Sequence, residues 1–332
     1  MGICLRRREV IAGLGGAAAW PLAARAQQRD RMRRIGVLMN LAADDPESVA
    51  RIAAFAQGLG ELGWTIGRNA QVDYRWAVGD PERFRRHAED LVALMPDLIV
   101  AHGRQAVRPV LQATRTVPIV FVGMVDPVGT GIVESLARPG GNVTGFMTIE
   151  LSMGVKWLEL LKQIAPGVTR VAVLRDPIQG SGLSLFAAIQ AVAPLLRIDV
   201  SPVSVDDDDE IERGINAFVR GSDDGLIVTV STTAQIHRDR IIALGAKHRL
   251  PAVYPLRFFV TSGGLISYGP NSTDQYRQAA SYVNRILKGE KAGNLPVQAP
   301  VKYETVLNMK TAKALGLDLS PTVFARADEI IE

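Results

Sequence analysis

Short apolar runs alternate with amphipathic segments along most of the chain. Residues 35–39 are apolar and predict a buried strand, and residues 48–62 carry apolar side chains at helical spacing up to Gly63, where a helix would stop. Asp80 and Pro81 fit the N-cap and first turn of another helix. Further strands are predicted at 72–76, 97–101 and 118–122, and further helices at 81–94 and 105–114. This alternation predicts a parallel sheet with helices on both faces.

The same alternation restarts after the Gly/Pro-rich segment 138–142. Helices are predicted at 155–164, 183–196, 209–219, 235–248 and 273–287, and strands at 170–174, 198–203, 225–230, 251–254 and 265–268. Two runs of one kind, separated by a break near residues 123–146, predict two similar α/β lobes. The pattern leaves open whether the last 15 residues pack on a lobe or lie free.

Polar residues follow the predicted strands, and ligands of open parallel sheets bind beyond the carboxyl ends of strands. These candidate site residues are Asn40, His102, Gly103, Arg104, Gln105, Asp126, Arg175, Asp176, Ser231, Thr232 and Tyr254. Arg104 or Arg175 could hold a carboxylate through two parallel bonds. Asp126 or Asp176 could hold an ammonium group, and the hydroxyls at a helix N-terminus could bind an anion. Each residue could instead cap a helix, but their recurrence at one end of both sheets favours a ligand cleft.

Catalytic motifs are weak in this chain. The four histidines, His87, His102, His237 and His248, lack metal-ligand spacing, and there is no Gly-x-Ser-x-Gly elbow and no Walker loop. The acidic run 206–209 lacks the glycine and terminal glutamate of a calcium loop, which favours a solvated turn. We therefore expect no metal, no cofactor and no catalytic residue. An exported hydrolase using Asp126 and His102 is the alternative.

The first 26 residues have the three parts of an export signal. Arginines at 6–8 precede an apolar run at 12–24, and the small-x-small pattern at 24–26 predicts cleavage before Gln27. The adjacent arginines favour the twin-arginine route over general secretion. The apolar run is about half of the roughly 20 residues that span a bilayer, so a membrane anchor is disfavoured. We expect a soluble periplasmic protein.

Composition removes further functional classes. Cys4, the single cysteine, lies in the predicted signal, so the mature chain could form no disulfide and no thiolate metal site. The formal net charge is +4, but the predicted signal holds four arginines and one glutamate, which leaves the mature chain at about +1. The basic pI is therefore no argument for nucleic acid as a partner. The length of 332 residues suits two domains.

Four segments resemble a known family: 119–128 (IVFVGMVDPV), 136–145 (LARPGGNVTG), 286–291 (ILKGEK) and 308–317 (NMKTAKALGL). They are similar to substrate-binding proteins of bacterial ABC transporters, in the branch for tryptophan or other aromatic amino acids. The similarity runs from about Arg33 to the C-terminus. The resemblance implies the type I periplasmic-binding-protein fold, with two Rossmann-like lobes whose parallel sheets are flanked by helices and a ligand cleft between the lobes.

The resemblance also implies a division of the chain and a role. The N-terminal lobe would comprise 27–145 plus about 270–300, and the C-terminal lobe 146–269 plus about 301–332. The protein would be the monomeric binding component of an ABC importer, closing around a small-molecule solute and meeting a permease in the inner membrane. A sensory module of the same fold is a second alternative. A lac-repressor-type regulator would need a helix-turn-helix where the predicted signal stands.

Two places depart from the family's common pattern. Arg104 stands where a small hydroxyl residue is usual after Gly103, and Arg175-Asp176 stands where Tyr-Asn is frequent. Both changes add charge to the predicted cleft. We therefore expect a solute with at least one carboxylate, either a small organic acid or an amino acid.

Overall fold

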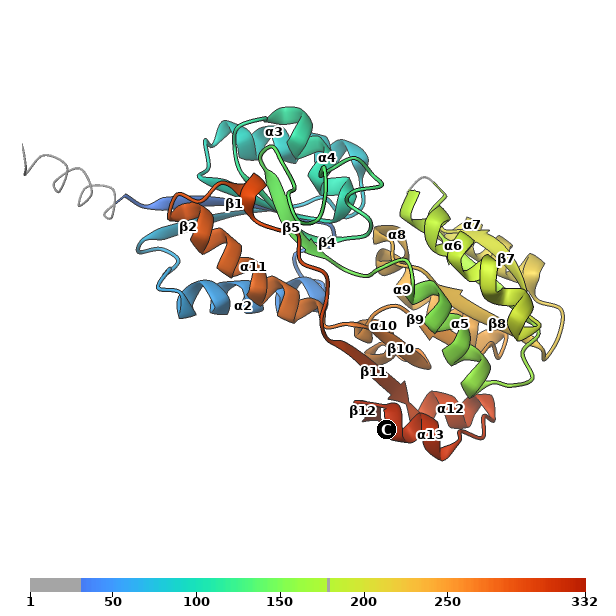
Figure 1. Ribbon diagram of the computed structural model, residues 1–332. Coiled ribbons are helices and arrows are strands. Elements are labelled where there is room, and N and C mark those ends of the chain that lie inside the picture. The colour runs from blue at the N-terminus through green and yellow to red at the C-terminus, as the bar shows by residue number, and fades with distance from the viewer. Residues whose placement is uncertain (1–30, 178–179) are drawn as a thin grey trace, which may run out of the picture.

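The computed structural model describes residues 31–177 and 180–332, which form two α/β lobes (Figure 1). The predicted export signal, residues 1–26 with Cys4, lies outside the described residues. Among the helices of the described segments, none has both the length and the apolar character needed to cross a membrane.

The first lobe is built on a five-stranded parallel sheet in the order β2-β1-β3-β4-β5. Its strands are β1 (Arg33–Met39), β2 (Ala70–Trp76), β3 (Leu98–His102), β4 (Ile119–Met124) and β5 (Val143–Met147). Helices α3 (Pro81–Ala93) and α4 (Gly103–Ala113) cover one face, and α2 (Pro46–Glu61) and α11 (Ser272–Leu287) cover the other. Asp45 and Asp80 cap α2 and α3 by accepting backbone N–H bonds, as predicted for Asp80.

The second lobe holds a seven-stranded sheet in the order β12-β11-β10-β9-β8-β6-β7, parallel except for the antiparallel pair β10–β11. Its strands are β6 (Arg170–Arg175), β7 (Asp199–Ser204), β8 (Asp224–Val228), β9 (Ala252–Tyr254), β10 (Ile266–Pro270), β11 (Tyr303–Asn308) and β12 (Glu329–Ile331). Its helices include α5 (Met153–Ile164), α6 (Gly180–Val192), α7 (Asp208–Phe218) and α9 (Arg238–Lys247), with short η1 (Ala193–Leu196), α8 (Thr232–Ile236) and α10 (Arg257–Thr261).

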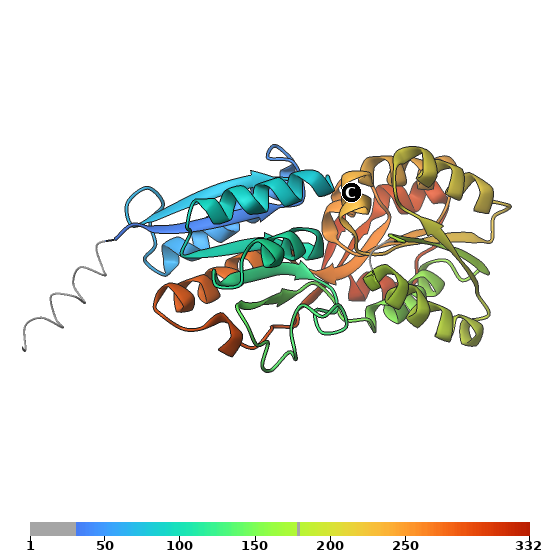
Figure 2. The ribbon, with the colours of Figure 1, turned by 90° about the horizontal axis from the view of Figure 1, so that it is seen from above.

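The chain passes between the lobes three times, as Figure 2 lets the reader follow. It leaves the first lobe after β5, returns at Asn271 between β10 and α11, and leaves again along 298–302 before β11. Between α11 and the third passage lies a short 3-10 helix, η2 (Ala292–Asn294). Phe146 of β5 and Gln298 form a parallel bridge, so the third passage begins beside the end of β5, where the first passage starts. Such multiple crossovers act as a hinge because a few residues absorb the rotation of one lobe against the other.

Strand β5 begins inside the segment near residues 123–146 that separates the two predicted runs, so the sequence pattern missed this strand. Its residues pair with β4 in parallel register. A Cβ added at Gly145 would lie 2.1 Å from the carbonyl oxygen of Phe121. Gly145 is therefore required by the close approach of β4.

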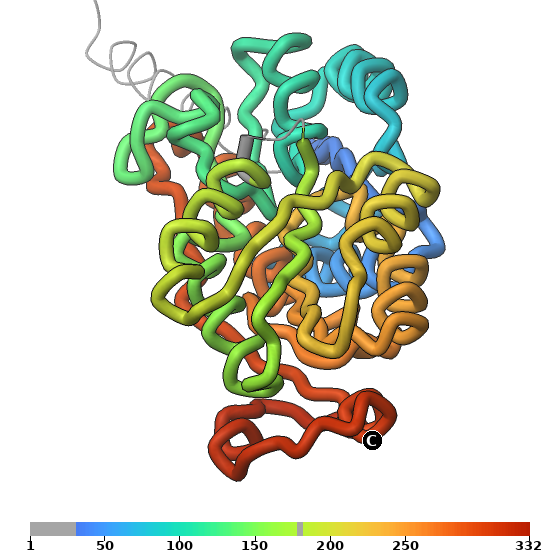
Figure 3. Tube along the Cα trace, turned by 90° about the vertical axis from the view of Figure 1, so that its right-hand side faces the viewer, coloured from blue at the N-terminus to red at the C-terminus, as the bar shows by residue number. Residues whose placement is uncertain are grey.

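One further prediction about elements is corrected, and one question that the sequence left open is answered. The helix predicted at 235–248 is two helices, α8 and α9, interrupted at His237, and α8 starts earlier than predicted because Ser231 caps it. The last 15 residues, left open by the sequence, follow α12 (Met309–Leu315) and form α13 (Pro321–Arg326) and β12. Val323 is buried in the core and β12 pairs with β11, so this tail packs on the second lobe (Figure 3).

Candidate functional site

The carboxyl ends of strands from the two sheets meet between the lobes. Asn40 follows β1 and is fully buried, and its side-chain amide donates to Thr232 Oγ1 of α8 at 3.3 Å and to Gln235 Oε1 at 3.5 Å. Thr232 is itself buried, at the start of α8. The predicted residues Asn40 and Thr232 are thus brought together across the two lobes.

Arg51 is the buried cation at this meeting point, with 1% of its surface exposed. Its Nε donates to Glu47 Oε1 at 2.9 Å and its Nη1 to Asn40 Oδ1 at 3.4 Å. Its Nη2 reaches the other lobe and donates to Gln235 Oε1 at 3.3 Å. A buried charge is tolerated only when paired and hydrogen-bonded, and these bonds supply that pairing from both lobes.

His102, at the end of β3, is held between Arg51 and Tyr276. Its Nε2 lies 3.5 Å from Arg51 Nη1 and its Nδ1 lies 2.8 Å from Tyr276 Oη. A guanidinium can only donate, so Nε2 accepts, Nδ1 carries the proton and donates to the Tyr276 oxygen, and Tyr276 donates to the sulfur of Met39. Burial, reinforced by the charge of Arg51, lowers the pKa of His102 well below its usual value. The histidine is therefore neutral at pH 7.

The lowered pKa of His102 predicts a loss of stability in acid. Above pH of about 6.5 the histidine is neutral in both folded and unfolded chains, and below it only the unfolded chain takes up the proton. Stability therefore falls as the pH drops from 7.5 to 5.5, by about 1 kcal/mol from this group. Urea unfolding of the wild type and of His102→Gln at both pH values measures this share. An equally steep pH dependence in the variant would contradict it.

Arg104 and Gln105 of α4 and Arg175 of β6 carry the polar atoms of a second candidate region, on opposite lobes. Within the described residues, Arg104 Nε, Gln105 Oε1, and Arg175 Nε and Nη1 are buried without a hydrogen-bond partner. Desolvation, followed by the charge of Arg108, lowers the pKa of Arg104, while the carboxylate of Asp176 on the other lobe opposes the shift. Buried unpaired donors cost free energy, and an anionic ligand would remove that cost.

The remaining predicted residues serve local structure. Asp126 Oδ1 accepts from the Gly129 N–H at 2.8 Å and shapes the turn after β4. Ser231 Oγ accepts from Ala234 N–H at 3.0 Å and caps α8. Gly103 begins α4 with φ of 71°. Tyr254 lies in the apolar core of the second lobe, stacked on the Phe259 ring at 5.2 Å between centroids, rather than between the lobes.

Arg51, Gln235 and Tyr276 were missed by the sequence reasoning. With His102, Thr148 and Gln275 they help to line an interlobe cavity of about 10 Å³, the space of about one water molecule. Arg51 lies on the buried stripe of α2, three residues after Ser48 and four before Phe55. A cation on the buried face of a helix is the feature that could have revealed it.

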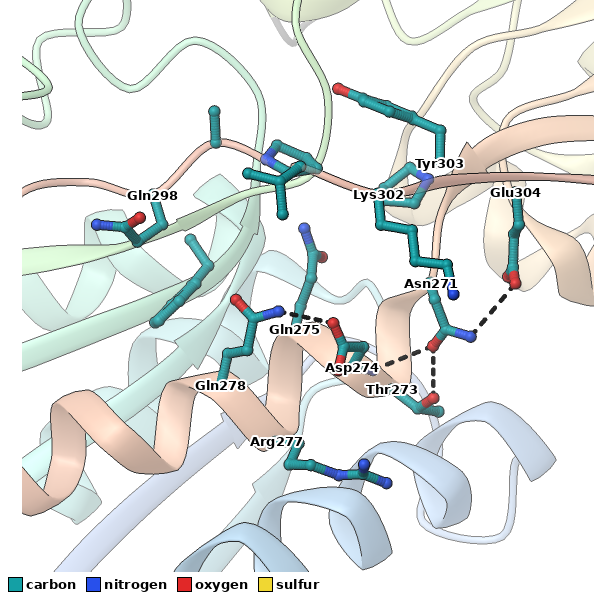
Figure 4. A pocket seen from close by; sticks show the side chains of 15 residues that line it. Asn271, Thr273, Asp274, Gln275, Arg277, Gln278, Gln298, Lys302, Tyr303 and Glu304 are labelled. Carbon is teal, nitrogen blue, oxygen red and sulfur yellow. Dashed lines mark hydrogen bonds between the residues drawn. The ribbon is translucent and has the colours of Figure 1, made fainter.

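A separate hollow of about 280 Å³ lies at the hinge, lined mainly by the start of α11 and the third passage (Figure 4). Asn271 Oδ1 accepts from Thr273 Oγ1 at 2.6 Å and from the Asp274 N–H at 3.0 Å, and its Nδ2 donates to Glu304 at 3.4 Å. These bonds tie α11 to β11. The hollow is distinct from the candidate site at the carboxyl ends of the strands. Within the described residues no group of three or more acidic, histidine or cysteine side chains could hold a metal.

Similar proteins of known structure share this two-lobed arrangement. A conserved domain protein from Vibrio cholerae is 26% identical, with a TM-score of 0.83 over 90% of this chain and 100% of that one. An ABC domain from Streptococcus pneumonia in complex with L-Trp is 24% identical, also with a TM-score of 0.83 and the same coverage.

Sequence comparison gives a family as well as a fold. A tyrosine-binding protein from Clostridioides difficile (strain R20291) is 25% identical over 266 residues, which cover 79% of this chain and 75% of the relative. Residues 35–331 match the model of the ABC transporter substrate binding protein family. The chain therefore belongs to the family of ABC transporter substrate-binding proteins and has the type I periplasmic-binding-protein fold.

Proposed function

We propose that this protein is the periplasmic solute-binding component of an ABC importer and that its solute carries a carboxylate. The observation that supports the proposal is the set of buried N–H donors without a hydrogen-bond partner on Arg104 and Arg175, in a chain of this family. Two arginines from opposite lobes can grip one carboxylate only when the lobes are together. Solute binding is then coupled to hinge closure.

An amino acid is the solute class that fits these groups best. Arg104 or Arg175 would hold its carboxylate through two parallel bonds, and the carboxylate of Asp176 would lie close to its ammonium group. One relative is named for tyrosine and another structure contains L-Trp, which supports amino acids as the first compounds to test. The two added positive charges favour a solute with an additional acidic group.

The proposed function implies a transport cycle. The closed, loaded monomer would dock on a permease in the inner membrane and release its solute there on opening. Residues 1–26 would direct export by the twin-arginine route before cleavage. The same binding event could instead report the solute to a membrane receptor. A permease and an ATPase encoded beside this protein would favour transport over sensing.

A hydrolase using Asp126 and His102 is the competing function, and the side-chain contacts disfavour it. His102 is bonded to Tyr276 and Arg51, while Asp126 is bonded to the backbone of its own turn. A catalytic pair needs the base and its orienting carboxylate within hydrogen-bond reach. Ester turnover that is present in the wild type and lost in Asp126→Ala would favour the enzyme.

Arg104→Ala and Arg175→Ala are each expected to weaken solute binding by about 10-fold to 100-fold without unfolding the protein. Both side chains contain buried groups without partners, so their removal costs the fold little. A thermal-shift screen of L-amino acids and small dicarboxylates identifies a binder, and calorimetry then compares the variants. Unchanged affinity in both variants would place the site elsewhere, and a screen in which no carboxylate compound binds would contradict the proposal.

A further inference from the structure

An ion pair joins the two lobes beside the candidate site. Arg238 Nη1 of α9 donates to Asp45 Oδ2, next to α2, at 2.8 Å. The two side chains are only 14% and 12% exposed. Neither residue is among the proposed solute contacts. The pair is therefore a contact between the lobes that needs no solute.

Both partners of this ion pair are held in place by their own lobe. Asp45 Oδ1 accepts from the Glu47 N–H at 2.9 Å, so the same carboxylate caps α2 while its other oxygen faces Arg238. Arg238 Nη1 also donates to the Gln235 carbonyl at 3.1 Å, and its guanidinium lies 5.9 Å from the centroid of the Phe258 ring. Groups fixed in this way lose little side-chain entropy when they pair, so the ion pair gives a larger net stabilisation.

The ion pair belongs to a continuous interlobe surface. The Arg51 guanidinium lies 5.9 Å from the same Phe258 ring, so cations from the two lobes share one aromatic side chain. Beside it, Asn40 and Arg51 bond Thr232 and Gln235. The contacts of Arg51 and Asn40 with Phe258, Thr232 and Gln235 join the two lobes, as the ion pair does, so they would break together if the lobes rotated apart.

We propose that Asp45 and Arg238 form a closed-state latch, which determines how tightly the protein holds its solute without contacting it. The apparent affinity of a protein that binds only when closed is its intrinsic affinity scaled by the closed fraction. A latch raises that fraction before solute arrives. The proposal rests on the hinge closure of the proposed function but does not depend on which solute is bound.

The test measures lobe separation in solute-free protein. The full-length chain carries Cys4→Ser, so that only introduced cysteines are labelled. Nitroxide labels are attached at Glu82→Cys on α3 and Lys247→Cys on α9, two exposed positions. Bound solute is removed beforehand by unfolding and refolding the protein. The variant is Asp45→Asn, because asparagine caps a helix as well as aspartate does and removes only the charge. We expect electron–electron distances to lengthen and the closed-to-open ratio to fall about tenfold. Raising NaCl from about 0.05 to about 0.5 M should open the wild type more than the variant.

Asp80→Asn is the matched control, because Asp80 also caps a helix and pairs with an arginine, Arg83, but within one lobe and in solvent. Its distances should equal those of the wild type. Arg238→Gln should open the protein as Asp45→Asn does, and the double variant should open it no further than either. Identical distances in Asp45→Asn and the wild type, or additive opening in the double variant, would overturn the latch. These measurements use no solute, so they can support the latch even if no carboxylate compound binds.

Discussion

Arg51→Met is expected to abolish solute binding and to lower the free energy of unfolding by about 3 kcal/mol or more. The side chain is 1% exposed and donates to Glu47, Asn40 and Gln235. Methionine fills a similar volume but leaves these acceptors without their donor. Breaking a buried pair from one side is costly because the remaining charge stays buried. Binding fails as well, since Arg51 joins the lobes.

Two further variants identify the cause of the effect. One tests whether a positive charge without the geometry of arginine is enough, and the other tests whether the loss of any cation has the same effect. Arg51→Lys keeps the charge but not the planar set of donors, so we expect intermediate stability and weak binding. Arg85 also pairs with glutamates on its own helix, but its side chain is 54% exposed. Arg85→Met should leave stability and binding unchanged. Urea unfolding and calorimetry with the best binder measure both quantities, and wild-type behaviour of Arg51→Met would refute this view of the site.

Gly145→Ala is expected to lower the free energy of unfolding by about 3 kcal/mol or more, or to prevent folding. The new Cβ would lie 2.1 Å from the Phe121 carbonyl oxygen and 2.6 Å from the Phe121 ring. Both atoms belong to Phe121 in β4, which pairs with β5. Phe121 therefore cannot move away without disturbing this pairing. Overpacking of this kind forces backbone shifts in the first sheet.

Gly167→Ala is the matched control for Gly145→Ala. Gly167 lies in the turn between α5 and β6, and no atom lies within 4 Å of a Cβ built there. We expect stability within about 0.5 kcal/mol of the wild type. Circular dichroism and urea unfolding of both variants provide the comparison. A fully stable Gly145→Ala would mean that β4 and β5 can move apart at low cost.

Periodicity predicted most of the central elements because buried parallel strands and amphipathic helices repeat at different spacings. Strand β1 and helix α3 were found within two residues of their bounds. Strand β5 was missed because it contains Gly145 and follows two glycines, and glycine-rich composition predicts a turn unless the packing partner is known. The sequence pattern did not predict strands β11 and β12, because their pairing depends on residues far apart in the chain.

The sequence predicted where the candidate site lies, but it did not predict all of the residues that form it. Polar residues after parallel strands mark the edge where a ligand can bind, and Asn40, His102 and Thr232 do meet there. Tyr254 is the last residue of β9, but its ring packs in the core of its lobe. Arg51 lies in the middle of a helix, so a rule based on strand ends could not select it.

Native mass spectrometry tests the central claim most directly. The wild type and an Arg104→Ala/Arg175→Ala double variant are mixed with the best compound from the amino-acid and dicarboxylate screen, and with its amide analogue, which lacks the carboxylate charge. We predict a one-to-one complex of the wild type with the acid, little with the amide, and none with the double variant. Equal binding of the amide and the acid, or equal binding by the double variant, would contradict a carboxylate held between these two arginines.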